Sequence, residues 1–145
     1  TPPGEERVSN RVITLATRET RILTNADGAV GHSDSGPGLL IGEWSPAHGH
    51  EAGCVLWDLR QPLVPERRRM LFNAWNMGYV SYRAGRLLHS SPTHLNLVGL
   101  DGSITPLLEH GGGSDYDSRV KANLSPCGRV ATYMVNGDIK LLVLS

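Results

Sequence analysis

The chain has 145 residues, a formal net charge of zero and a pI near 7. This balance argues against a basic nucleic-acid-binding domain or a protein held electrostatically on an anionic membrane. Its 17 glycines and 9 prolines favour short strands joined by turns. No apolar run approaches the roughly 20 residues of a membrane-spanning helix. We therefore expect one domain with its own core and neither a nucleic-acid nor a membrane partner.

The chain opens with a polar stretch, residues 1–10, which we expect to be a flexible N-terminal segment. Two short β-branched runs follow, at 11–17 and 20–24, and predict a pair of strands. A connecting loop at 25–28 then leads into longer units of strands and turns. The N-terminal pair matches the second half of one such unit, so we expect the chain to start partway through a repeat.

Three turn glycines, Gly38, Gly85 and Gly128, set the period of these units, with spacings of 47 and then 43 residues. Placed in register on them, residues 31–41 fall over 78–88 and over 121–131. Apolar strands follow each turn at 55–59, 96–100 and 140–144, and the first two units add a fourth strand at 69–72 and 104–108. A four-strand unit of about 40–50 residues is the period of a β-propeller blade.

The sequence thus predicts an all-β fold of about three four-stranded antiparallel blades in an incomplete ring. Thirteen strands are expected, grouped as two, four, four and three, in a partial propeller over residues 11–145 with blade ends near 25, 73, 110 and 145. Closed propellers have about four to eight blades. The chain is then part of a longer polypeptide, or a homodimer or a complementary chain completes the ring; we expect the shared ring.

The two cysteines, Cys54 and Cys127, belong to different units, so a disulfide between them is not expected. Cys54 opens an apolar strand and should be buried, whereas Cys127 lies in a turn and should be exposed. Unpaired thiols favour a reducing compartment. We expect a soluble, cytoplasmic protein.

Blade topology sorts the loops onto two faces, and the chemically rich segments share one of them. We predict ligand-binding residues in these segments: Trp44, Trp75, Asn76, Asp115, Tyr116 and Asp117. Aromatic side chains stack on the apolar faces of sugars, although packing between blades explains them equally well. The two aspartates are too few for calcium and also suit a polar link. His48, His50 and Glu51 occupy a glycine-rich loop, where we favour solvated side chains over a metal site.

His32 heads an innermost strand and is our candidate metal ligand, because imidazole binds divalent metals and exchanges protons near neutral pH. The alternative is a histidine that hydrogen-bonds to the next blade. Asp34 shares its face of the strand and would either orient His32 or cap a loop.

Several of these segments carry a family resemblance. Ser125-Pro126-Cys127-Gly128-Arg129 resembles the Ser-Pro-Asp-Gly-Arg turn of TolB-like propellers, with Cys127 in place of the usual Asp. Residues 31–43, which contain His32, are similar to blade starts of oligogalacturonate-lyase-like propellers, and 69–73 are similar to their fourth strand. Trp57-Asp58 gives a weaker resemblance to WD-repeat propellers.

The lyase-like resemblance implies β-elimination on uronate-containing oligosaccharides, with a divalent metal held by several histidines. His32 matches a family-type blade-start histidine, whereas the register places Tyr79 and Ala122 at the other two starts. Under this resemblance Tyr79, Tyr82 and Arg83 become candidate catalytic residues for proton transfer and charge neutralisation. The alternative function is a non-catalytic propeller scaffold that binds protein or another ligand.

Overall fold

The computed structural model describes residues 11–22, 28–46, 53–60, 68–73, 79–112 and 120–144; the predicted flexible segment 1–10 lies outside them. These described residues form strands and turns, without a helix. The strands are β1 (Arg11–Ile13), β2 (Thr20–Ile22), β3 (Gly28–Gly36), β4 (Leu39–Pro46), β5 (Gly53–Asp58), β6 (Arg69–Asn73), β7 (Val80–Arg83), β8 (Arg86–Ser90), β9 (His94–Val98), β10 (Ile104–Glu109), β11 (Lys121–Leu124), β12 (Val130–Val135) and β13 (Asp138–Val143).

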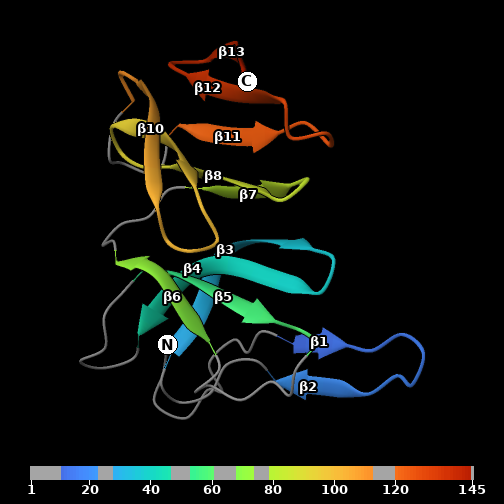
Figure 1. Ribbon diagram of the computed structural model, residues 1–145. Coiled ribbons are helices and arrows are strands. Elements are labelled where there is room, and N and C mark those ends of the chain that lie inside the picture. Colours follow the sequence, from blue (N-terminus) through green and yellow to red (C-terminus); the bar gives the residue numbers. More distant parts are fainter. Residues whose placement is uncertain are drawn as a thin grey trace.

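The strands form one hairpin and three stacked sheets (Figure 1). β1 pairs with β2; sheet I has the order β3-β4-β5-β6, sheet II β7-β8-β9-β10 and sheet III β11-β12-β13. Every pairing is antiparallel and joins strands that are consecutive in the chain. For the described residues the predicted all-β class and the grouping of two, four, four and three strands are therefore confirmed.

Glycine turns connect the first two strands of each sheet, as the sequence predicts. Gly38, Gly85 and Gly128 have φ angles of 73°, 79° and 68°, in the left-handed region that glycine enters without a steric penalty. Asn136 and Gly137 have φ angles of 52° and 84°, the pattern of the two-residue hairpin turn predicted between β12 and β13. These turns set the length and register of each sheet.

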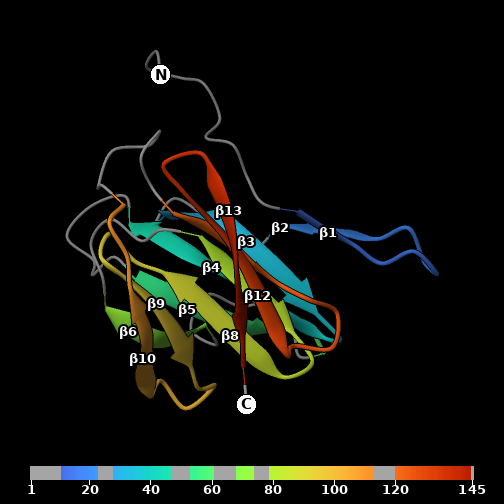
Figure 2. The same cartoon turned by 90° about the horizontal axis from the view of Figure 1, so that it is seen from above.

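The sheets stack through their first strands, so that β3 contacts β7 and β7 contacts β11; Figure 2 looks along this stack. Alternate residues of β8 face opposite ways, because successive side chains of a strand point to opposite faces. Leu87 packs with Ile41 and Leu56 of sheet I, whereas Leu88 packs with Leu124 of sheet III. Sheet II thus packs on one face against sheet I and on the other against sheet III.

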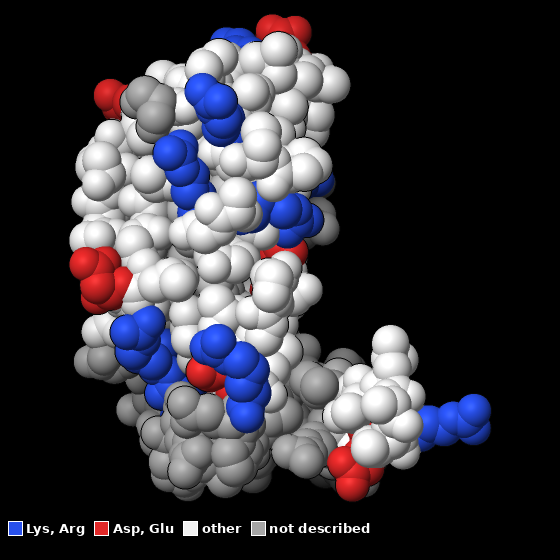
Figure 3. Space-filling view, turned by 45° about the vertical axis from the view of Figure 1, so that its right-hand side comes forward, with Lys and Arg blue, Asp and Glu red and all other residues white. Residues whose placement is uncertain are grey.

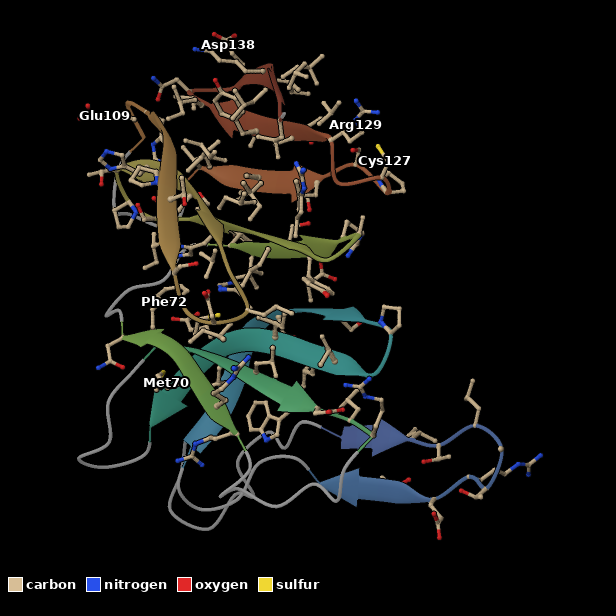
Figure 4. The ribbon with its side chains drawn as sticks, viewed as in Figure 1. Met70, Phe72, Glu109, Cys127, Arg129 and Asp138 are labelled. Atoms are coloured by element: carbon tan, nitrogen blue, oxygen red, sulfur yellow. The ribbon has the colours of Figure 1, made fainter. Side chains whose placement is uncertain are left out.

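A buried histidine between sheets I and II lacks hydrogen-bond partners. His89 of β8 is 4% exposed, and neither of its ring nitrogens has a hydrogen-bond partner. Its ring lies 4.8 Å from that of Phe72, centroid to centroid, and Figure 4 shows Phe72 at the side of sheet I nearest sheet II. Burial lowers the pKa of His89 to about 4, so the neutral imidazole is the form that packs here.

The turn that opens sheet III is longer than its two counterparts. Two residues separate the last paired residues of β3 and β4, and two also separate those of β7 and β8. In sheet III the backbone N–H of Ser125 donates to the carbonyl oxygen of Val130, at 2.8 Å, so this turn contains four residues. Gly128 consequently sits one position later in its turn than Gly38 and Gly85 do in theirs.

This difference corrects the predicted register by one residue. When the strand pairs rather than the glycines are superimposed, the residue equivalent to His32 and Tyr79 is Lys121. The prediction of Ala122 at this position is wrong, because it assumed turns of equal length. Ala122 is instead buried against sheet II, 3% exposed.

Candidate functional site

The three equivalent strand starts form a row of side chains across the stack. The rings of His32 and Tyr79 lie 4.7 Å apart, centroid to centroid, at an interplanar angle of 44°. The ammonium nitrogen of Lys121 lies 5.8 Å from the centroid of the Tyr79 ring, within reach of a cation–π attraction. All three residues are half-buried, so each presents part of its side chain to solvent.

A carboxylate extends this row within sheet I. Nδ1 of His32 lies 3.3 Å from Oε2 of Glu43, which comes from the neighbouring strand β4. When Nδ1 carries the ring proton, it donates to Glu43 and leaves Nε2 as the acceptor or base. We name the His32, Glu43, Tyr79 and Lys121 side chains together the strand-start row.

A second polar cluster lies further along the same strands. Oδ2 of Asp34 accepts hydrogen bonds from the backbone N–H of Tyr82, at 2.8 Å, and from Nη1 of Arg83, at 2.6 Å. Burial raises the pKa of Asp34, but hydrogen bonds from Arg83, Tyr82 and Ser35, with the Arg83 charge, outweigh it and leave the pKa lowered. Asp34 is thus an ionised link between sheets I and II.

These contacts place the three predicted catalytic residues in different surroundings. Tyr79 belongs to the strand-start row, next to the predicted metal ligand His32. The Tyr82 residue is 7% exposed and packs in the core between sheets I and II, and Arg83 pairs with Asp34. Of the two roles considered for Asp34, the orientation of His32 is not observed, because Asp34 accepts hydrogen bonds from Tyr82 and Arg83 of sheet II and Glu43 contacts the imidazole.

Most of the predicted ligand-binding residues lie outside the described residues, namely Trp75, Asn76, Asp115, Tyr116 and Asp117. The loop residues His48, His50 and Glu51, for which solvated side chains are expected, lie outside them too. For Trp44 the structure gives the backbone, which pairs with Val30 at the end of β4. Among the described residues the strand-start row therefore supplies one aromatic side chain, that of Tyr79.

A metal centre does not fit the described residues. Nowhere in these segments do three His, Cys, Asp or Glu side chains gather closely enough to hold an ion. His32 and Glu43 supply two ligands, fewer than the three protein ligands typical of a catalytic zinc site.

Sequence reasoning missed two members of the row, Glu43 and Lys121. Glu43 had a usable signal, because a two-residue turn at Pro37-Gly38 places position 43 across from His32. Lys121 had no such signal, because the alignment of the repeats on their turn glycines assigned its position to Ala122.

Positive and negative side chains are interspersed on the surface, as the zero net charge suggests. In Figure 3 the Lys and Arg side chains of the visible face lie in separate groups, with Asp and Glu side chains among them.

The predictions for the two cysteines are confirmed: Cys54 is buried and Cys127 exposed, both as free thiols. Burial, with the Glu43 charge, raises the pKa of Cys54 to about 12. Figure 4 shows Cys127 at the β11–β12 turn.

No protein-family model matches the chain, and no curated protein matches its sequence significantly. The described residues contain no helix that is long and apolar enough to span a membrane.

Proposed function

We propose that sheets I to III are blades of a β-propeller and that the strand-start row binds an acidic carbohydrate. Three features support the propeller: each sheet is an up-and-down meander, the period falls in the range of propeller blades, and first strands adjoin along the stack. In such a ring the strand-start row would lie at one end of the central channel.

The class of ligand is inferred from the order in which charged, aromatic and hydrogen-bonding side chains follow one another along the row. Lys121 supplies a cation for a uronate carboxylate. Tyr79 supplies an aromatic surface for the apolar face of a sugar ring. His32 and Glu43, paired at 3.3 Å, supply a donor and acceptors for hydroxyl groups. Together these groups suit an oligosaccharide that contains uronate units.

The same geometry suits β-elimination on that ligand. Nε2 of His32 would take the proton from the carbon next to the carboxylate while Lys121 balances the carboxylate charge. The released electron pair forms the ring double bond, and the glycosidic oxygen on the adjacent carbon leaves with a proton from solvent. Glu43 holds Nδ1 and thereby sets the tautomer with Nε2 unprotonated.

The test compares Lys121→Ala with Lys140→Ala in calorimetric titrations with oligogalacturonate. Lys140 is an exposed lysine on β13, which β12 separates from β11 in the same sheet, and it serves as the matched control. We expect about a tenfold loss of affinity for Lys121→Ala, the order of one charge-assisted contact, and none for Lys140→Ala. No binding by the unchanged protein, or equal affinities of the two variants, would contradict the carbohydrate proposal.

The alternative function is a non-catalytic scaffold, which the two-ligand His32–Glu43 pair favours over a metal-dependent lyase. Absorbance of the unsaturated uronate product separates the two. The lyase proposal expects product formation that His32→Gln abolishes while oligogalacturonate still binds. Binding without any product in the unchanged protein would assign the row to recognition alone.

A further inference from the structure

The strand-start row carries opposite charges at its two ends. Lys121 supplies a positive charge on sheet III and Glu43 a negative charge on sheet I, with the aromatic ring of Tyr79 on the sheet between them. Two further charges on the first strands, those of Asp34 and Arg83, pair with each other at 2.6 Å. They offset one another and leave the polarity of the row unchanged.

The negative end of the row is held in place. Oε2 of Glu43 lies 3.3 Å from Nδ1 of His32, and a Cβ added at Gly31 would lie 3.2 Å from the same oxygen. The carboxylate therefore fits closely between the imidazole and the β3 backbone. The Glu43 side chain is 22% exposed, so solvent screens its charge only in part.

This charge distinguishes between the sugar units that can follow a uronate along the row. The steps of the row are 4.7 Å from His32 to Tyr79 and 5.8 Å from Tyr79 to Nζ of Lys121, each comparable to the length of one sugar unit. An oligosaccharide with a uronate at Lys121 therefore brings its next unit toward the sheet I end.

A second carboxylate at the sheet I end would face Glu43 at short range. With a neutral imidazole the His32–Glu43 pair has a net negative charge, and like charges brought together disfavour binding. An ammonium group on the sugar would instead form a charge-assisted hydrogen bond with the Glu43 carboxylate. The charge order of the row thus fits a ligand with one acidic and one basic unit.

We propose that the row binds its ligand in one direction and selects a mixed oligosaccharide, with a uronate at Lys121 and an amino sugar at Glu43. Part of the specificity then comes from repulsion, because Glu43 disfavours a second uronate. This inference rests on the proposed carbohydrate binding and makes Glu43 the residue that determines which sugar follows the uronate. Oligogalacturonate still binds, but more weakly than the mixed ligand.

The first test compares two disaccharides by calorimetric titration at pH 7 and low ionic strength: glucuronate linked to glucosamine, and glucuronate linked to glucuronate. We expect about tenfold tighter binding of the amino disaccharide. Glu43→Gln should remove this preference by weakening the binding of the amino disaccharide and strengthening that of the other. Asp138→Asn should keep it, because Asp138 is an exposed carboxylate on β13, which β12 separates from β11.

The outcomes distinguish this inference from the function on which it rests. Equal affinities of the unchanged protein, tighter binding of diglucuronate, or a preference that persists in Glu43→Gln overturns the inference and leaves carbohydrate binding in place. No binding of either disaccharide by a protein that binds oligogalacturonate also overturns it. No binding of any of the three ligands contradicts both proposals. The comparison of the two ligands on the unchanged protein needs no variant, and far-UV circular dichroism checks that Glu43→Gln folds.

The second test locates the amino sugar by NMR of protein with ¹³C-labelled glutamate carboxyl groups. The Glu43 signal, assigned through its loss in Glu43→Gln, should shift with the amino disaccharide and stay in place with glucuronate alone, because a single uronate is expected at Lys121. The signal of Glu109, an exposed glutamate on β10, is the reference. Equal shifts of the Glu43 signal with both ligands, or none with the disaccharide, overturn the assigned direction.

Discussion

Lowering the pH from 7 to 4 is expected to reduce the free energy of unfolding by about 3 kcal/mol through His89 alone. The folded-state pKa of about 4 lies below the ordinary value of 6.5, because burial disfavours the imidazolium. Between these values the unfolded chain binds a proton that the folded chain does not. The His89 contribution is therefore complete above pH 6.5 and is lost as the pH falls toward 4.

Urea unfolding at pH 7, 6, 5 and 4 measures this loss, with His89→Leu as the test variant. Removing the imidazole also removes two buried nitrogens without partners, so the variant should match or exceed the unchanged protein near pH 4. His94→Leu, at a half-buried histidine of β9, is the control. Burial also lowers the pKa of His110, so a weaker pH dependence of the free energy of unfolding remains in His89→Leu. Equal pH slopes for the unchanged protein and His89→Leu would contradict the assignment.

Replacing Gly36 by alanine is expected to cost about 2–3 kcal/mol of stability, the upper part of the range for overpacking. A Cβ at Gly36 would overlap the ring of Tyr82, which is held in the core between sheets I and II. The new methyl group would have to separate β3 from β7 and would weaken the Asp34 hydrogen bond to the Tyr82 backbone. Chemical unfolding at pH 7 measures the loss.

Gly111→Ala is the matched control, because a Cβ there meets no atom within 4 Å. A double variant, Gly36→Ala with Tyr82→Leu, tests the mechanism, since a smaller side chain leaves room for the methyl group. Its total loss should be smaller than the sum of the two single losses. Additive losses would show that the Gly36 effect comes from elsewhere.

The strands were predictable because the turn residues carry strong local information. Gly38, Gly85 and the Asn136-Gly137 pair adopt the positive φ angles that their residue types favour, and each separates runs that pair as antiparallel neighbours. The grouping of strands follows directly from these turns.

The site was harder to predict because it depends on register across distant segments. A turn with two extra residues moved Lys121, rather than Ala122, into line with Tyr79. The buried state of His89 and the link from Asp34 to Tyr82 arise from the packing of one sheet on the next. Contacts between residues almost 50 positions apart leave no local pattern in a single sequence.

The order of the strands also bears on how the chain folds. Because each strand pairs with the strand just before it, every sheet can close through short loops, which carry a small entropic cost. Each sheet then makes contacts only with its immediate neighbours, as in linear repeat proteins. Sheet II packs against both of the others, so cooperative unfolding of sheets I and III depends on sheet II. A destabilising substitution in sheet II would therefore let sheets I and III unfold independently.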